Sequence, residues 1–333
     1  MPELASNFQI HQLVDLGERR AVWDQLIDLE PWITFSKEQW MFMCELEYCN
    51  ILVVKTDEGE LASVVGYCSP PDVSYAYVGP IVTSAKYRQQ GLARALFEKM
   101  MENLSGTGKF VSLHSIGPQT AKYRSTYTPF AGETSQLCSI PSADLLHIVV
   151  EELEKPHHQT TEPVLCHLYD RDKDFGDILR FDQNITKRSR ERDLRLLCDT
   201  DVFETFVARN AGHDLIGFMI LQTLKHQKGD RLLVDRMRIG PLYANDFRTS
   251  LCLMKLAAQR MLDRQRTRGA DQSVLWLRFQ RENSVISNFI TANQDRVSLF
   301  CVFERSSSVE FDKDTIDGTK VWMIAGTCSM PEC

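Results

Sequence analysis

Residues 77–96 read Tyr77-Val-Gly-Pro-Ile-Val-Thr-Ser-Ala-Lys-Tyr-Arg-Gln-Gln-Gly-Leu-Ala-Arg-Ala-Leu96, and this segment is the most informative part of the sequence. Its first residues form a β-rich run, whereas Leu92 and Leu96 recur at helical spacing. Gly91 stands between the two patterns, where a glycine lets the backbone approach a ligand closely. The free N–H groups and the positive dipole end of a helix start favour anions. The stretch therefore predicts a strand, a loop that cradles pyrophosphate, and a helix.

The loop differs from the two common phosphate-binding motifs. No Lys-Ser/Thr pair follows Gly91, so it is not a Walker loop, and it lacks the Gly-x-Gly-x-x-Gly of dinucleotide-binding folds. Taken alone, Arg88-Gln-Gln-Gly-Leu-Ala93 is also compatible with a plain helix start at which Gly91 packs closely.

The surrounding sequence predicts a mixed α/β unit. Apolar residues recur at helical spacing in two segments, and Ser36 is placed as an N-cap. The β-rich runs are separated by turn residues. The expected elements are helices at Asp15 to Glu30 and Ser36 to Tyr48, strands at Ile51 to Lys55, Ala62 to Cys68 and Tyr75 to Val82, a strand at Phe110 to Ile116, and a short helix or turn at Pro118 to Phe130.

The same order recurs in the C-terminal half. Aligning Gly79-Pro80 with Gly240-Pro241 gives an offset of 161 residues, the difference between 240 and 79. This alignment predicts an internal duplication, and the alternative is two unrelated α/β units that share a turn. The expected elements are strands at Phe203 to Arg209, Leu215 to Leu221 and Leu232 to Tyr243, a helix through Leu251 to Met261, a strand at Val274 to Phe279, a helix at Val285 to Ala292, and a strand at Val321 to Ala325.

Length and composition agree with two globular domains. The chain has 333 residues, and a domain typically has roughly 100–200. With 43% hydrophobic and 25% charged residues, the chain is neither fibrous nor largely disordered. The polar, proline-bracketed segment Glu151 to Pro163 is typical of a linker. We expect an N-terminal domain at residues 1–150, a linker at 151–163 and a C-terminal domain at 164–333.

Net charge and hydropathy argue against two classes of partner, nucleic acids and membranes. The net charge of -7 argues against a general nucleic-acid binder. No apolar run reaches the ~18 residues of a membrane span, and the N-terminus lacks a signal-peptide pattern. We therefore expect a cytoplasmic protein with no membrane partner. The basic run Lys187 to Arg192 is typical of a solvated helix face.

The cysteines and histidines do not predict a metal site. The ten cysteines include no Cys-x-x-Cys pair and no zinc spacing with histidine, so we expect reduced thiols. The adjacent His157 and His158 have no acidic or thiol companion at ligand spacing, which favours a solvated linker.

The stretch from Tyr77 to Leu96 resembles motif A of the GNAT N-acetyltransferase superfamily, in which a strand and a helix flank Arg/Gln-x-x-Gly-x-Gly/Ala. The resemblance covers about residues 8 to 130, and the whole chain resembles the tandem YitH/HolE-type acetyltransferases. It implies an α/β (α+β) fold with two GNAT-like domains in tandem, each a mixed, mostly antiparallel sheet flanked by helices. The implied activity is transfer of an acetyl group from acetyl-CoA to an amine of a small molecule.

The same resemblance assigns the cofactor site. The preceding strand would hold the pantetheine arm through Ile81 and Val82. The residues that would line the phosphates are Arg88, Gln89, Gln90, Gly91, Leu92 and Ala93. In the second copy Cys252 stands at the position of Gly91, where a side chain would crowd the phosphates. We expect a degenerate C-terminal domain that shapes the acceptor pocket or replaces the partner of a GNAT dimer in a monomeric chain.

The resemblance leaves the catalytic residues less defined. A tyrosine after the fifth strand would serve the departing thiolate, which indicates Tyr123, with Tyr127 as its competitor. An amine with a pKa near ~10.4 must also lose a proton before it attacks. The candidates for this base are Ser74, Tyr75 and Tyr77 on the strand and Glu45 and Glu47 on the second expected helix.

Two further points stay open. His114, on the fifth strand, contacts substrate or is a core histidine. Other functions that fit the sequence are a CoA-binding sensor or partner-binding module without turnover, and a protein N-acetyltransferase.

Overall fold

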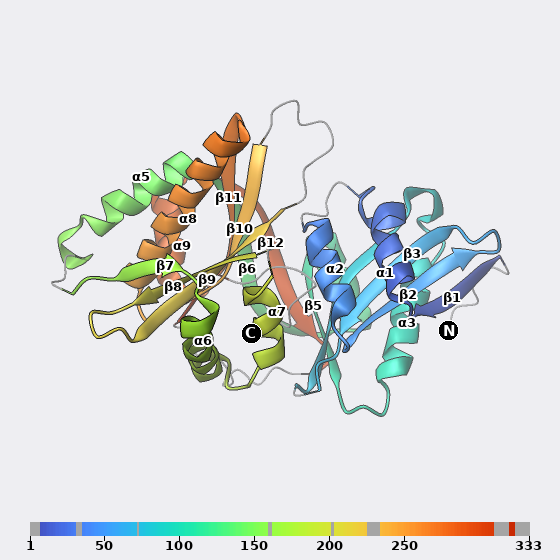
Figure 1. Ribbon diagram of the computed structural model, residues 1–333. Coiled ribbons are helices and arrows are strands. Elements are labelled where there is room, and N and C mark those ends of the chain that lie inside the picture. The colour runs from blue at the N-terminus through green and yellow to red at the C-terminus, as the bar shows by residue number, and fades with distance from the viewer. Residues whose placement is uncertain are drawn as a thin grey trace. The chain divides into compact units, whose positions relative to one another are not determined.

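The computed structural model describes residues 7–30, 35–71, 73–158, 162–200, 203–224, 234–309 and 320–323. These residues form two compact units (Figure 1). Unit 1 contains the described residues up to Gly132 together with residues 304–309, and unit 2 contains residues 133–303 and 320–323.

Unit 1 is a mixed, mostly antiparallel sheet flanked by helices. The sheet order is β1-β2-β3-β4-β5, followed by the last residues of β12, and only the β4–β5 pair among the first five strands is parallel. The elements are β1 (Phe8–Leu13), α1 (Leu16–Val22), the π-helical η1 (Trp23–Ile27), α2 (Lys37–Glu45), β2 (Cys49–Thr56), β3 (Leu61–Cys68), β4 (Tyr75–Thr83), the 3-10 turn η2 (Ala85–Tyr87), α3 (Leu92–Leu104), β5 (Phe110–Ile116), α4 (Pro118–Thr126) and the start of β6 (Phe130–Pro141).

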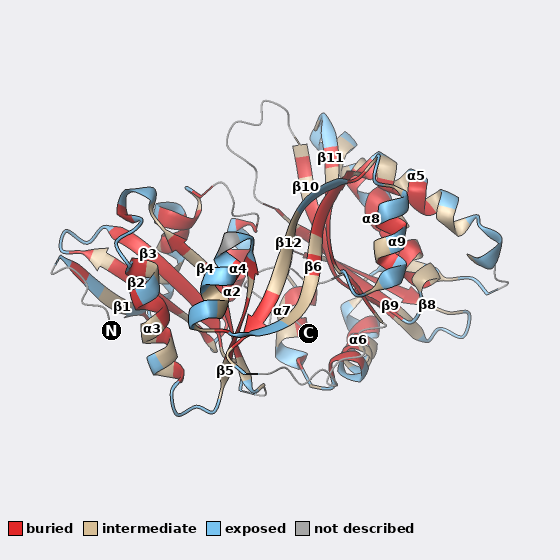
Figure 2. Cartoon of the chain, turned by 180° about the vertical axis from the view of Figure 1, so that it is seen from behind, coloured by how far each residue is buried: buried red, intermediate tan, exposed pale blue. Residues whose placement is uncertain are grey.

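Local sequence explains these elements. Ser36 is the expected N-cap of α2: its hydroxyl accepts the Gln39 N–H, and the Gln39 side chain accepts the Ser36 N–H. The apolar stripe of α3 packs on the side chains of Ala76 and Val78 in β4 and on their neighbours in β5. Figure 2 shows the middle strands buried, and every residue of β3 is buried.

Unit 2 repeats this order. Its sheet order is the start of β12, then β6-β11-β10-β9-β8-β7, with β13 paired to β10. The elements are the rest of β6, α5 (Ser142–Leu153), the 3-10 turn η3 (Pro156–His158), β7 (Leu165–Leu168), α6 (Arg171–Thr186), α7 (Glu191–Cys198), β8 (Phe203–Arg209), β9 (Leu215–Thr223), β10 (Val234–Ala244), α8 (Phe247–Arg268), β11 (Gln272–Gln280), α9 (Ser284–Ala292), β12 (Ser298–Ser307) and β13 (Val321–Met323).

The two Gly-Pro pairs occupy equivalent positions in the two copies. The β3–β4 register shifts at Gly79-Pro80, and the β9–β10 register shifts at Gly240-Pro241. Both glycines have a φ of 154°. Each pair forms a β-bulge in the strand that precedes the long helix, so the two aligned positions are structurally equivalent.

The compact units differ from the domains expected from the sequence. Most of β6 and all of α5 lie in unit 2, whereas the end of β12 lies in unit 1. The Ser308 N–H, just beyond β12, donates to the Val111 carbonyl, and the Ser308 hydroxyl accepts the Val111 N–H. Each unit is therefore completed by a strand from the other half of the sequence.

Two local expectations change. The segment 151–163 is not an extended linker throughout, because α5 continues to Leu153 and η3 follows; residues 159–161 lie outside the described part. Cys49 and Cys68, directly opposite in the β2–β3 ladder, form a disulfide, so the expectation of reduced thiols is wrong for this pair.

The basic run 187–192 is not wholly solvated. The side chain of Arg190 is 5% exposed and is bound to the carboxylate of Asp182, which is fully buried. A buried carboxylate needs its cationic partner, because neither water nor an apolar neighbour replaces it.

We predict that Arg190→Met lowers the free energy of unfolding by about 3–5 kcal/mol, because it removes the guanidinium from a buried carboxylate. Urea denaturation measures this change. The matched control is Arg180→Met, which removes the 77%-exposed partner of Asp177 and should cost less than about 1 kcal/mol. Similar losses in the two variants would contradict the burial argument.

Candidate functional site

Strands β4 and β5 diverge in the middle of unit 1. They pair from Tyr75–Phe110 to Val78–Leu113, and the register ends there. The bulge at Gly79-Pro80 follows, after which Ile81 and Val82 pair with β3 on their other side. Within the described residues no strand lies beside this second half of β4 on the side away from β3. Its backbone edge can therefore bond an extended ligand.

A glycine-capped helix start lies at the end of this edge. The chain passes from β4 through η2 into a loop in which Gln89 and Gly91 have φ values of 68° and 77°. Gly91 is the N-cap of α3 and offers no side chain to the first helical N–H groups. These groups have no partner within the helix and lie at its positive dipole end, which suits a phosphate.

The basic side chains of the loop are already bound to carboxylates. The Arg88 guanidinium donates to both oxygens of Glu30 at 2.6 and 2.8 Å and to the Thr83 carbonyl at 3.1 Å. The Lys86 ammonium donates to Glu60 at 2.8 Å. The loop therefore presents backbone N–H groups, and Arg88 helps to hold its shape.

The backbone conformation at position 91 is a second reason why the loop needs a glycine there. A Cβ built there meets no protein atom within 4 Å, so the surrounding chain does not exclude a side chain. A φ of 77° does disfavour one. Glycine thus fixes the backbone shape of the loop as well as leaving space in front of it.

A tyrosine–histidine pair lies where β4 and β5 separate. The Tyr77 hydroxyl is 3.0 Å from Nδ1 of His114, which directly follows the last paired residue of β5. Tyr77 and Ser112 are register partners, so their side chains share the face opposite α3. Tyr75 lies two residues before Tyr77 on this face, with its ring 5.7 Å from that of Phe110.

The acidic candidates lie elsewhere in unit 1. Glu47 is exposed in the turn between α2 and β2, so its expected position on the helix is wrong. Glu45 is the last residue of α2, and its carboxylate accepts from Arg20 at 2.6 Å. The leucine between them caps α2 in an extended conformation, which ends the helix before Glu47.

The two tyrosines of the α4 segment pack on α3. The rings of Tyr123 and Tyr127 lie 5.9 and 4.3 Å from the ring of Phe97. Burial raises the pKa of Tyr123 to about 12. Burial, followed by the charge of Glu98, also raises the pKa of Tyr127. Both phenols are therefore protonated at neutral pH.

In unit 2 the strand edge equivalent to the open edge of β4 is paired with another strand of the same chain. The parallel pairing of β10 and β11 ends at Ile239–Leu277, and β13 then pairs with Leu242 and Tyr243 of β10. The Trp322 indole N–H donates to the Ala244 carbonyl at 3.0 Å. Strand β13 thus occupies the edge that is open in unit 1.

The first N–H groups of the equivalent helix in unit 2 also have a partner within the chain. Helix α8 begins at Phe247, and Cys252 lies within it, so there is no loop equivalent to that of unit 1. The Asp246 carboxylate caps α8 and accepts the N–H and hydroxyl of Thr249 at 2.7 and 3.0 Å. A carboxylate therefore already holds the place that suits an anion in unit 1.

The family model for the acetyltransferase (GNAT) family matches residues 19–120, which span β4, the glycine loop and β5. The chain carries a GNAT domain. This family is one of acyltransferases, and the match includes the stretch on which the resemblance rests. No curated protein sequence is significantly similar to the chain. Among the described residues, no helix has the length and hydrophobicity to span a membrane.

Several solved structures share the fold. A tandem GNAT protein from the clavulanic acid biosynthesis pathway is 12% identical with a TM-score of 0.64, covering 90% of this chain and 98% of its own. N-myristoyltransferase of Saccharomyces cerevisiae, solved with bound myristoyl-CoA, is 9% identical with a TM-score of 0.62, covering 96% and 85%. The likeness to the tandem GNAT protein confirms a fold with two GNAT-like units.

A third similar structure is a fungal multi-domain GH3 β-N-acetylglucosaminidase with a GCN5-related glucosamine N-acetyltransferase region. It is 12% identical with a TM-score of 0.59, and the match covers 90% of this chain. This chain spans only 38% of its length.

We predict opposite effects for two glycine substitutions. Gly91→Ala lowers the free energy of unfolding by about 1–2 kcal/mol, because alanine disfavours the left-handed backbone. The control Gly176→Ala, inside α6 where an added Cβ also meets nothing, raises it by roughly 0.4–1 kcal/mol. Urea denaturation of both variants measures the difference. A stabilising Gly91→Ala would contradict a requirement for positive φ.

Proposed function

We propose that the GNAT domain of unit 1 binds acetyl-CoA and transfers its acetyl group to an amine of a small molecule. The observation that carries this proposal is the open edge of β4, which leads directly to the glycine-capped start of α3. The arm of CoA is extended and amide-bearing, and its pyrophosphate is an anion, so the edge and the helix start match the two parts in order. The myristoyl-CoA and glucosamine named for similar structures agree with an acyl-CoA donor and a small amine acceptor.

The backbone from Arg88 to Ala93 holds the pyrophosphate. Since the Arg88 and Lys86 side chains are bound to carboxylates, the N–H groups at the start of α3 provide most of the attraction. Ile81 and Val82 line the pantetheine arm through their main chain. An N–H in this part of β4 also stabilises the charge that develops on the thioester oxygen.

The acceptor amine loses its proton to the Tyr77–His114 pair. Imidazole is the side chain most often used as a base near neutral pH, and the hydroxyl of Tyr77 orients this one through Nδ1. The pair lies where the two strands separate, at the inner end of the open edge. Tyr75 and Glu47 remain weaker candidates, because Tyr75 lies within the paired part of β4 and Glu47 lies in an exposed turn.

Tyr123 stabilises the departing thiolate by donating a hydrogen bond. Its pKa of about 12 lies roughly 3.5 units above that of an ordinary thiol at ~8.5. Full proton transfer from the phenol to the thiolate would therefore cost roughly 4–5 kcal/mol. A hydrogen bond without transfer avoids this cost, and the thiolate then takes the proton released by the amine.

We predict that Tyr123→Phe lowers kcat by about 100- to 1000-fold with little change in KM, because the lost donor acts on charge formed in the transition state. Steady-state release of the CoA thiol measures this. Tyr127→Phe tests the competing residue, and Tyr67→Phe, in β3, is the control for removal of a buried phenol. A full kcat in Tyr123→Phe together with a large loss in Tyr127→Phe would transfer the role to Tyr127.

Unit 2 binds no second CoA. Strand β13 covers the edge of β10, and Asp246 places a negative charge at the start of α8. A pyrophosphate there would meet a carboxylate instead of free N–H groups. The degenerate copy therefore leaves one donor site per chain.

Titration calorimetry with acetyl-CoA, followed by a thiol-release assay with a panel of small amines and peptides, tests the proposal. We predict one acetyl-CoA per chain and amine-dependent release of CoA with small amines. Binding without release would favour a CoA-binding module, and release with peptides alone would favour a protein acetyltransferase. Absence of binding would refute the proposal.

Two matched variants locate the site. Gly91→Val should weaken acetyl-CoA binding strongly, whereas Cys252→Val, at the aligned position within α8, should leave it unchanged. Equal effects in the two variants would refute the assignment to unit 1.

A further inference from the structure

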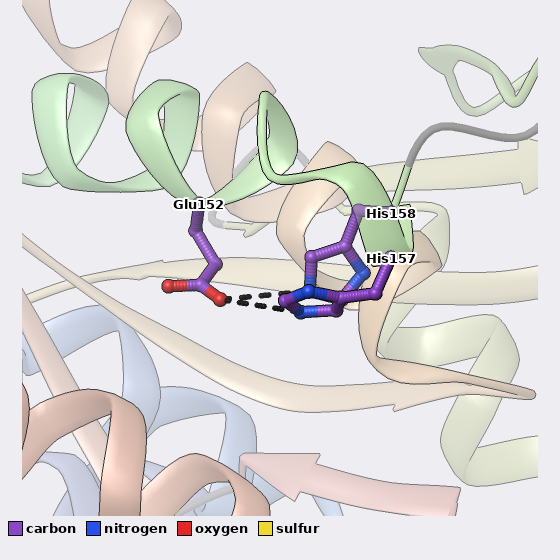
Figure 3. Close-up of side chains that lie close together, drawn as sticks. All are labelled: Glu152, His157 and His158. Atoms are coloured by element: carbon purple, nitrogen blue, oxygen red, sulfur yellow. Dashed lines mark ion pairs between the residues drawn. The ribbon is translucent and has the colours of Figure 1, made fainter.

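The end of α5 brings together three side chains that can hold a metal ion. Glu152 lies in the last turn of α5, and His157 and His158 lie in η3. One ligand atom from each residue lies within 4.8 Å of the other two. Oε1 of Glu152 is 3.8 Å from Nε2 of His157 and 3.6 Å from Nε2 of His158. Figure 3 shows the carboxylate pointing toward both imidazole rings.

Two consecutive tight turns create this arrangement. The Lys155 N–H donates to the Glu152 carbonyl, and the His158 N–H donates to the Lys155 carbonyl. Pro156 prevents the helix from continuing, so the chain folds back beside its last turn. The histidines therefore do have an acidic companion, and the sequence-based expectation of none is wrong.

His158 is the buried member of the cluster. Its side chain is 10% exposed, and its ring lies 5.7 Å from that of Phe247. Within the part of the chain that the structure describes, its Nε2 is buried without a hydrogen-bond partner. A buried nitrogen of this kind calls for a ligand, and here it is directed at a carboxylate that lies beyond hydrogen-bond distance.

The second oxygen of Glu152 is already engaged. Oε2 accepts a hydrogen bond from the Lys155 ammonium at 2.7 Å, which leaves Oε1 directed toward the imidazoles. Outer contacts of this type orient the ligands of metal sites.

We propose that Glu152, His157 and His158 bind one Zn²⁺ or a chemically similar divalent transition ion, with water at the open position. Two imidazoles and one carboxylate are a known zinc ligand set. Bonds of about 2.0–2.1 Å in tetrahedral geometry separate ligand atoms by roughly 3.3–3.5 Å, so only small movements would close the site. Nitrogen ligands disfavour Mg²⁺ and Ca²⁺, which prefer oxygen. This site is independent of the proposed acyl transfer.

The test uses the full chain without a histidine tag. Titration calorimetry with Zn²⁺ should give one equivalent per chain, excess Mg²⁺ should not displace it, and Co²⁺ should produce the visible bands of a tetrahedral complex. Zn²⁺ should also raise the melting temperature, because it links the end of α5 to η3. No binding, or binding of Mg²⁺ with equal affinity, would overturn the proposal.

Variants assign the ligands. His157→Ala and Glu152→Gln should each weaken Zn²⁺ binding by more than about 10-fold, the lower end of the loss caused by changes outside the first ligand shell. His157 is 64% exposed, so its loss should not affect folding. The matched control is His147→Ala, which removes an exposed histidine that pairs with Glu151 at 3.1 Å on the same helix. Equal losses in His147→Ala and His157→Ala would show nonspecific surface binding and refute the site.

Discussion

The β-bulge at Gly79-Pro80 is the constraint on which the candidate site depends. It shifts the register of β4 against β3, and beyond it β4 no longer pairs with β5. A parallel pair that continued would satisfy the backbone edge from Ile81 to Thr83 internally and leave nothing for a ligand. The bulge therefore leaves this backbone edge open for the proposed donor. The chain then needs only a short loop to bring the start of α3 to the end of that edge.

The second copy retains the bulge but has neither the open edge nor the free helix start of the candidate site. Gly240-Pro241 interrupts β10 in the same way, yet β13 takes the vacated edge. Helix α8 begins at Phe247, five residues before Cys252, and so absorbs the segment that forms the loop in unit 1. Asp246 then satisfies the helix start with its own carboxylate. Strand separation and a free helix start are thus separate features, because unit 2 has the first without the second.

Local patterns explain what the sequence predicted well. The period of apolar residues and the Ser36 cap located the first helices, and the Gly-Pro alignment predicted the repeated order of elements. The hypotheses that depended on distant contacts were less complete. Nothing in the spacing of Glu152 and His157 shows that two tight turns return the chain to its own helix end. The Cys49–Cys68 pair likewise depends on the register of a hairpin, which the turn sets.

The domain boundary failed to match the compact units for a related reason. Strand β6 and the end of β12 have mixed burial and no regular alternation of apolar residues, so neither is evident as a strand. Tertiary contacts determine which unit each of these strands joins, and local propensity does not encode those contacts. The segment after Glu151 is polar, but a polar segment need not mark the point where the packing divides.

The exchange of strands has a consequence for how the protein is made. The bonds that place Ser308 beside Val111 join residues 197 positions apart in the chain. During synthesis, β5 leaves the ribosome long before the segment that covers its edge, so the N-terminal unit stays incomplete while nearly all of unit 2 is added. An uncovered strand edge invites pairing with other chains. The first copy, although it carries the proposed donor site, is therefore not an independent folding unit, and its completion waits for the second.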